Sequence, residues 1–191
     1  IRDRSWIELT GSPLLQQKTP LEIANEIRTT VKEEVGLTVS IGVSFNKIFA
    51  KLGSDMKKPD AVTVITRESF KDQIWPLPVS DLLYVGRATT EKIRLYGIRT
   101  IGDLAQADRA MLIHRFGVNG EKLWVFANGL DQSRVMPCGY EIPIKSVGHG
   151  ITCTDDLFSK DEVRHVLMEL SQEVGLKLRK NKLAATRVRI S

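Results

Sequence analysis

The sequence predicts an α+β protein built from several parts, and three observations support this fold class. Apolar residues recur every four positions in some segments, which is typical of amphipathic helices, and alternate in others, which is typical of strands. Pro76 and Pro78 interrupt the first mixed region, and a second proline-containing stretch lies at residues 136–144. Between these interruptions the chain reads as short helices separated by glycines. We therefore expect an α/β unit, an all-helical unit and a second, partial α/β unit.

The first unit, residues 1–74, begins with a strand-like run at residues 5–10. A helix is expected next, because Thr19 is a good N-cap residue and Pro20 fits the first helical position, where its missing N–H costs nothing. Glu22 can close a capping box with Thr19. The sequence therefore marks the start of this helix to the residue.

The remainder of the first unit continues the alternation of helix and strand. Gly36 is expected to end the helix, and residues 37–43 alternate as a strand does. A second helix is expected from Ser44 to about Ser54, followed by a strand at residues 61–65. The predicted order is strand, helix, strand, helix, strand.

The second unit, residues 75–135, is predicted to be all-helical, and residues 136–144 read as a linker. The third unit, residues 145–191, is expected to contain a strand near residues 145–152, a long helix and a final strand from Leu183. Ser159 opens the long helix, whose apolar stripe consists of Val163, Val166, Leu167, Leu170, Val174 and Leu178.

Composition limits the possible functions. The 191 residues carry a net charge of +5 and a pI near 9.3, which suits a polyanionic partner without proving one. Two cysteines and three scattered histidines indicate neither a disulfide framework nor a zinc site. No apolar run is long enough to span a bilayer, so we expect a cytoplasmic protein with no membrane partner. Strand-like runs at both ends suggest a fragment of a longer protein.

The segment at residues 79–105 suggests a site for DNA phosphates. A short helix, a glycine turn and a longer helix follow one another, so free N–H groups and the positive end of a helix dipole meet at the turn. The segment resembles a helix-hairpin-helix motif, usually written Gly-x-Gly, with Ala88 in the place of the second glycine. A methyl group there would hold a phosphate farther off or disfavour a positive φ angle. The expected DNA contacts are Gly86, Arg87, Ala88, Thr89 and Lys92; a plain helical hairpin is the alternative.

Residues 39–60, VSIGVSFNKIFAKLGSDMKKPD, resemble the palm of Y-family DNA polymerases at nearly every position of the family pattern. Residues 6–12 resemble the strand and turn after the family's catalytic carboxylates, and residues 145–148 resemble the entry to its little finger. The likeness covers essentially the whole chain and is nearest to the bacterial DNA polymerase IV type.

The resemblance implies domains and partners for this chain. The palm would be residues 1–74, the thumb 75–135, the linker 136–144 and the little finger 145–191. Primer-template DNA and a dNTP would be its partners, and a sliding clamp would bind a C-terminal segment absent here. Lys58 matches the lysine that contacts the nucleotide's phosphates. Pro59 restricts Lys58 to extended geometry, although a solvated lysine in a turn is the alternative.

The resemblance also implies a magnesium site, which this chain carries only in part. Asp3 matches a catalytic, metal-binding aspartate of the family, but Arg4 stands where the family has glutamate. A cation there repels Mg²⁺. The family's other metal-binding aspartate belongs to an earlier strand. We therefore expect the parent protein to be a DNA-directed DNA polymerase and this chain alone to be inactive.

The last fifteen residues form a second candidate DNA surface. Six basic residues between Lys177 and Arg189 are offset by no carboxylate. Arg187 and Arg189 are expected on one face of the final strand, where they would contact phosphates together with Lys145 and Ser146. A solvated basic face is the alternative.

Three functions remain open from the sequence. The first is a fragment of a low-fidelity translesion polymerase. The second is a non-catalytic repair module that binds the DNA backbone through the same scaffold, with Arg4 as a genuine replacement. The third is a basic globular protein with no nucleic-acid role, which would show weak and salt-insensitive DNA binding.

Overall fold

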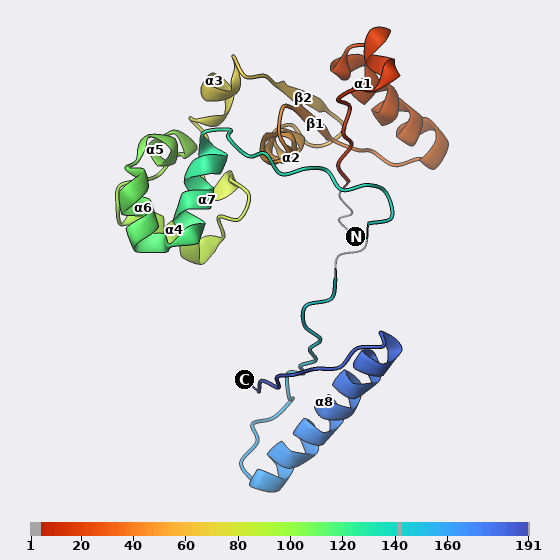
Figure 1. Ribbon diagram of the computed structural model, residues 1–191, viewed down its shortest axis with the longest axis vertical. Coiled ribbons are helices and arrows are strands. Elements are labelled where there is room, and N and C mark those ends of the chain that lie inside the picture. Colours follow the sequence, from red (N-terminus) through yellow and green to blue (C-terminus); the bar gives the residue numbers. More distant parts are fainter. Residues whose placement is uncertain (1–4, 141–142, 191) are drawn as a thin grey trace. The chain divides into compact units, whose positions relative to one another are not determined.

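The chain divides after Met136 into two units, residues 1–136 and 137–191 (Figure 1). The structure is a computed structural model that describes residues 5–140 and 143–190. The first unit holds the sheet and most of the helices. The second holds one long helix with an extended segment on each side.

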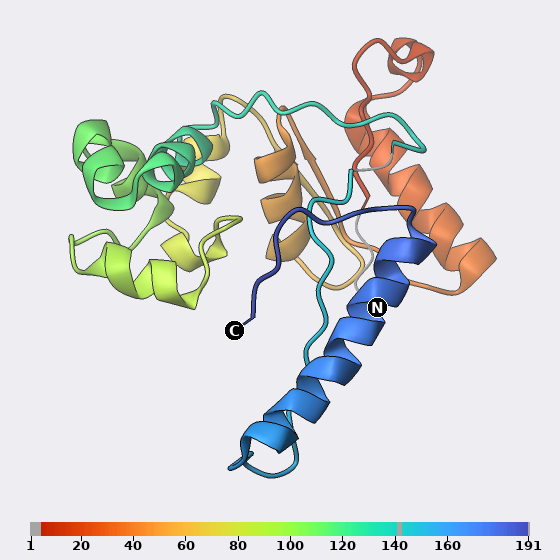
Figure 2. The same cartoon turned by 60° about the horizontal axis from the view of Figure 1, so that its bottom comes forward.

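A parallel pair of strands forms the sheet of the first unit. Strand β1 (Ile41–Ser44) pairs with β2 (Val62–Ile65), and Ile41 lies opposite Val62. Helix α2 (Lys47–Met56) connects the two strands and packs against them (Figure 2). The contact is close at Gly42, where an added Cβ would lie 1.8 Å from the carbonyl oxygen of Ala50. Only glycine therefore allows α2 to approach the strand this closely.

The first long helix begins where its capping residues predict. Helix α1 (Pro20–Thr30) has Thr19 as N-cap and a complete capping box with Glu22. It continues as a π-helical turn (Val31–Val35) and ends at Gly36, whose φ of 71° is left-handed. A 3-10 turn (Pro13–Gln16) precedes it.

The prediction of a strand at residues 5–10 is wrong, and all of these residues are described by the structure. They contain no strand, because an extended segment becomes a strand only when a neighbour accepts and donates its backbone hydrogen bonds. The strand predicted at residues 37–43 starts later, at Ile41, and the helix predicted from Ser44 starts at Lys47. Asn46 caps that helix through its side chain, which accepts from the Phe49 N–H at 2.8 Å.

Short helices make up the rest of the first unit, both within residues 75–135, where they were predicted, and at residues 70–74, where no helix was predicted. They are α3 (Phe70–Ile74), a 3-10 turn (Val79–Asp81), α4 (Arg87–Arg94), α5 (Ile101–Gln106), α6 (Arg109–Phe116) and α7 (Val118–Ala127). Their buried side chains belong to the same cluster as Phe49 and Ile65 of the sheet. One cluster of buried residues therefore extends across the prolines at 76 and 78, and the compact unit continues to Met136.

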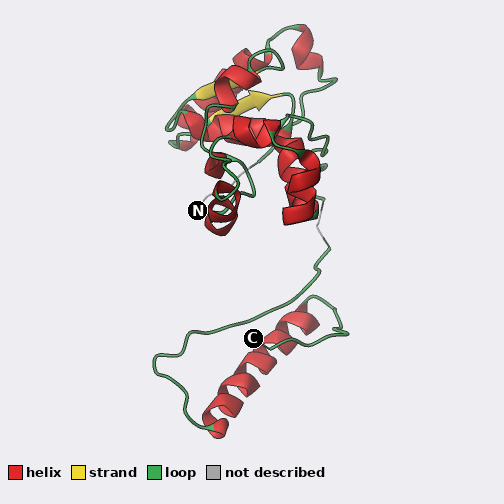
Figure 3. Ribbon diagram, turned by 90° about the vertical axis from the view of Figure 1, so that its left-hand side faces the viewer, coloured by secondary structure: helices red, strands yellow, loops and turns green. Residues whose placement is uncertain are grey.

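Helix α8 (Lys160–Lys180) dominates the second unit and has the predicted N-cap, Ser159, with a capping box to Glu162. The strands predicted at residues 145–152 and from Leu183 are wrong for residues 143–190, which contain no strand (Figure 3). No residue of α8 is fully buried. Within its predicted apolar stripe, Val163 is exposed and the other five residues are partly buried. Without a buried face to pack on, the extended segments gain little from pairing.

No helix among the described residues is both long enough and apolar enough to cross a membrane.

Candidate functional site

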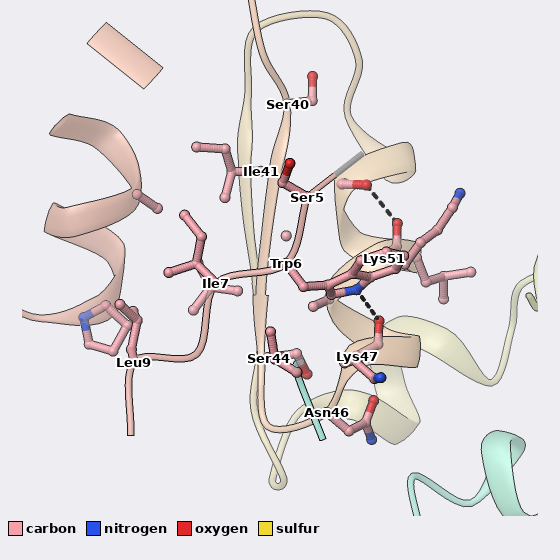
Figure 4. A pocket seen from close by; sticks show the side chains of 18 of the residues that line it. Ser5, Trp6, Ile7, Leu9, Ser40, Ile41, Ser44, Asn46, Lys47 and Lys51 are labelled. Atoms are coloured by element: carbon pink, nitrogen blue, oxygen red, sulfur yellow. Dashed lines mark hydrogen bonds between the residues drawn. The ribbon is translucent and has the colours of Figure 1, made fainter. Parts of the chain in front are cut away.

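An open groove of about 1870 Å³ runs through the first unit between the N-terminal segment, α1, β1 and α2. The turn before β2, residues 131–135, and Leu77, Ser80 and Asp81 also line it. Figure 4 shows Trp6 beside α2, with its indole near Lys47 and Lys51, and Ile7 directed to the other side. The groove therefore lies where the family resemblance places the palm.

Residues at the start of α2 line the groove and also hold neighbouring segments in place. The Lys47 carbonyl accepts a hydrogen bond from Trp6 Nε1 at 3.5 Å (Figure 4). Lys47 Nζ donates to the Arg134 carbonyl at 2.7 Å, and Asn46 Nδ2 donates to the Gly129 carbonyl at 3.2 Å. The segment after α7 is thereby tied back to the sheet (Figure 2).

Lys58 lies at the edge of the groove and is paired with a carboxylate. Its Nζ is 2.5 Å from Asp55 Oδ1, while Lys51 pairs with the other oxygen of Asp55. The Lys58 side chain is 55% exposed. An anion in the groove can therefore reach Lys58, but it must compete with Asp55. The sequence analysis did not predict the ion pair between Lys58 and Asp55. Their spacing of three residues at the end of a helix was the signal that could have predicted it.

Asp60 ties the turn that carries Lys58 to α1. Its carboxylate contacts Arg28 Nη1 at 2.8 Å and Lys32 Nζ at 2.7 Å. Hydrogen bonds from Lys32 and then from Arg28 lower the pKa of Asp60 below its usual value. The sequence reasoning missed this clamp, because its members lie about thirty residues apart. The spacing of Arg28 and Lys32 by four residues on one helix was the available signal.

The described residues do not supply a metal site. Residues 5–140 and 143–190 contain no cluster of three or more histidine, cysteine, aspartate or glutamate side chains with the geometry to hold a metal ion. Mg²⁺ requires several oxygen ligands in a near-octahedral arrangement, and the described groove offers no such set. Asp3, the predicted metal ligand, and Arg4 lie outside the described residues.

The helical hairpin presents an uncapped helix N-terminus. Gly86 is the N-cap of α4, and no side chain accepts a hydrogen bond from the first N–H groups of that helix. Those groups and the helix dipole favour an anion there. The Arg87 side chain is 93% exposed and pairs with Glu91 at 3.1 Å. Lys92 is exposed on the same helix, and Thr89 is half-buried.

Ala88 does not weaken this site through its backbone. The expected need for a positive φ angle at Ala88 is wrong, because Ala88 lies inside α4, where the backbone is right-handed. The left-handed position lies four residues earlier, at Tyr84, whose φ is 71°. A Gly-x-Gly turn supplies such a conformation at no cost. In this chain the left-handed residue of the turn is Tyr84, and Val85 and the N-cap Gly86 follow it.

The hairpin is held by backbone pairing and by a buried core. The Val79 N–H donates to the Arg99 carbonyl at 2.9 Å, and the Ile101 N–H donates to the Leu77 carbonyl at 2.9 Å. Val79 and Ile101 are fully buried. Thr100 caps α5 in a box with Asp103, and the N–H groups of Arg99 and Thr100 lower the pKa of Asp103. These contacts position the turn that carries Gly86.

The basic residues of the second unit are exposed but are not placed by a sheet. Lys145, Ser146, Arg187 and Arg189 are all exposed, and none lies in a strand. The prediction that Arg187 and Arg189 share one face of a strand therefore fails for the described residues, because the strand does not form. The segment at residues 145–148 is instead held beside α8 by Lys177 Nζ, which donates to the Gly148 carbonyl at 3.3 Å.

Solved structures identify the class to which this architecture belongs. DinB from Sulfolobus solfataricus matches 60% of this chain with a TM-score of 0.54 and 25% sequence identity, over 34% of its own length. A Y-family DNA polymerase chimera matches 61% of this chain with a TM-score of 0.55 and the same identity, over 34% of its length. The mixed helix and strand fold is that of the Y-family DNA polymerases.

Family models and curated relatives narrow the class. The model of the impB/mucB/samB family matches residues 2–55, and the model of that family's C-terminal domain matches residues 144–191. DNA polymerase IV of Acetivibrio thermocellus is 50% identical over 189 residues, which are 99% of this chain and 47% of the relative. DNA polymerase IV 1 of Bacillus subtilis is 36% identical over 97% of this chain and 44% of the relative. The chain belongs to the impB/mucB/samB family, in its bacterial DNA polymerase IV branch, and spans about half the length of these curated relatives.

Proposed function

We propose that this chain carries part of the palm, the thumb and part of the little finger of a translesion DNA polymerase. The whole protein would add dNTPs to a primer 3′ end on damaged template DNA. The domain limits are residues 1–74, 75–135 and 145–191, with a linker at 136–144. A sliding clamp would bind outside this chain. The uncapped, exposed N-terminus of α4 at Gly86 carries the proposal for this chain, because it fits a phosphate of primer-template DNA.

Lys58 would contact the triphosphate of the incoming nucleotide. The proposal rests on its exposed ammonium at the edge of the groove and on the family motif around it. Asp55 neutralises Lys58 in the absence of a nucleotide, and a phosphate would take its place. The clamp of Arg28 and Lys32 on Asp60 would keep the turn in position during this exchange.

Catalysis would need Mg²⁺, which activates the primer 3′ oxygen and neutralises the leaving group. Asp3 would be one of its ligands, and residues 5–140 and 143–190 do not supply the cluster of further carboxylates that would complete the site. A non-catalytic DNA-binding module is a second candidate, and Arg4 in the place of the family's glutamate favours it. We expect no primer extension by the 191-residue chain with Mg²⁺ and all four dNTPs. Clear extension would overturn this expectation.

Gly86→Asp tests the DNA site directly. The position has an extended backbone with open space around it, so an aspartate fits and can cap α4 with its carboxylate. We expect a Tm at or above that of the wild type and DNA affinity lower by about tenfold or more, because the carboxylate occupies the N–H groups and repels phosphate. Affinity is measured by fluorescence anisotropy on a labelled primer-template duplex.

Gly86→Asn is the matched control for charge, because asparagine also caps the helix but adds no negative charge. It should weaken DNA binding less than Gly86→Asp does. Arg87→Ala should reduce the steepness of the plot of log affinity against log salt concentration by about 1, which corresponds to the loss of one phosphate contact. If Gly86→Asp binds DNA as tightly as the wild type does, the proposed site is wrong.

A further inference from the structure

Tyr84 is an aromatic residue in a backbone conformation that favours glycine. Its φ is 71°, whereas bulky side chains rarely occupy the left-handed region. Its side chain does not offset this by deep burial, since the residue is 73% exposed. A ring that is both disfavoured by its backbone and left in water calls for a role outside the core.

The surroundings of Tyr84 hold the ring in place without covering it. Its ring centroid lies 5.9 Å from that of Phe126 on α7, with the two planes tilted by 32°. The next residue, Val85, is buried, so the chain on one side of Tyr84 is anchored in the core. The ring therefore lies at the surface and is supported by a tilted contact with Phe126.

The position of Tyr84 relative to α4 indicates what the ring contacts. Tyr84 precedes the N-cap Gly86 by two residues, so their Cα atoms are at most about 7.6 Å apart. A phosphate at the α4 N-terminus would bring an adjoining deoxyribose within reach of the ring. Tyrosine is suited to such a contact, because its ring covers apolar sugar atoms while its hydroxyl stays in water.

We infer that the Tyr84 ring is a DNA contact of the hairpin and packs on a deoxyribose beside the phosphate held at Gly86. The inference rests on the proposed DNA-binding function of that turn. Part of the affinity for DNA would then come from the uncharged contact of the Tyr84 ring. Loss of the ring should therefore weaken binding and leave its salt dependence unchanged, because no counterion is released by an apolar contact.

Tyr84→Asn removes the ring and keeps a residue that tolerates left-handed backbone. We expect about tenfold weaker binding of the 191-residue chain to a labelled primer-template duplex, with an unchanged salt slope. The Tm should not fall below that of the wild type. Tyr84→Phe should bind as the wild type does, because the ring and not the hydroxyl makes the contact.

Tyr96→Asn is the matched control. Tyr96 is also partly exposed but follows the C-terminal end of α4, where the helix dipole disfavours a phosphate. Its loss should leave DNA affinity unchanged. If Tyr84→Asn binds as tightly as the wild type, or if it lowers the Tm and leaves affinity intact, the ring is only structural and the inference is wrong. If Gly86→Asp also leaves affinity unchanged, the proposed function itself fails.

Discussion

The hairpin of the first unit and the basic segment of the second unit both carry exposed cations, but only the hairpin is fixed by a core. Arg87 and Lys92 project from a helix whose Ile93 is fully buried. Arg187 and Arg189 follow α8, in which no residue is buried. The comparison teaches that a run of positive charge becomes a defined phosphate site only where buried apolar residues hold the backbone that carries it.

The largest expected difference in stability between the two units is that between two glycine substitutions, one in each unit. Gly42→Ala would place a Cβ 1.8 Å from the Ala50 carbonyl and force α2 away from β1, so we expect a loss of about 1–3 kcal/mol or more in the free energy of unfolding. Gly148→Ala meets no atom within 4 Å and should change stability by less than about 0.5 kcal/mol.

Urea unfolding followed by tryptophan fluorescence measures the change in the first unit, because Trp6, Trp75 and Trp124 all lie in it. Circular dichroism reports the helices of both units, so a loss of helical signal without a change in tryptophan fluorescence reports α8. Equal effects of the two glycine substitutions on the fluorescence transition would break the comparison.

An intermediate effect is expected at two helix caps. Thr100→Ala and Ser159→Ala each remove an N-cap hydroxyl from a capping box, at a local cost of about 1 kcal/mol. In the first unit this cost should appear as a lower urea midpoint of the tryptophan signal, because α5 is part of the core. In the second unit it should appear only as a loss of helical circular dichroism. A shift of the tryptophan midpoint by Ser159→Ala would contradict the separation of the two units.

The smallest effect concerns pH. The pKa of Asp103 is lowered by the N–H groups of Arg99 and Thr100, and the pKa of Glu162 is lowered by the backbone and side chain of Ser159. A carboxyl with a lowered folded-state pKa contributes stability above its unfolded pKa, and the contribution is lost as pH falls through the folded pKa. Both helices should therefore weaken as pH falls below about 4.

Asp103→Asn should reduce the fall in the Tm of the first unit between about pH 5 and pH 3. Glu162→Gln should reduce the loss of α8 helicity over the same range and leave the tryptophan transition unaffected. An unchanged pH dependence in both variants would show that these carboxylates are not the groups that titrate.

The accuracy of the sequence predictions follows the distance over which each interaction acts. Thr19 and Ser159 were recognised as caps because a capping box needs only residues three apart. The strand at residues 5–10 was wrong because alternation shows extended backbone but not the partner that completes a ladder. The clamp on Asp60 stayed hidden for the same reason, because Arg28 and Lys32 lie about thirty residues from Asp60 in the chain. The pairing of Lys58 with Asp55 is local, so its spacing could have predicted it.

The sequence by itself determined where the capped helices α1 and α8 begin and which family the chain resembles, because these depend on local residue types and spacing. Tertiary structure alone decided that Tyr84 and not Ala88 takes the left-handed position, and that Gly86 is left as an open N-cap. Packing of Val85 and Ile93 in the core fixes that backbone, and no local pattern encodes it. The proposed phosphate site thus consists of neighbouring residues whose backbone is positioned by the core beneath them.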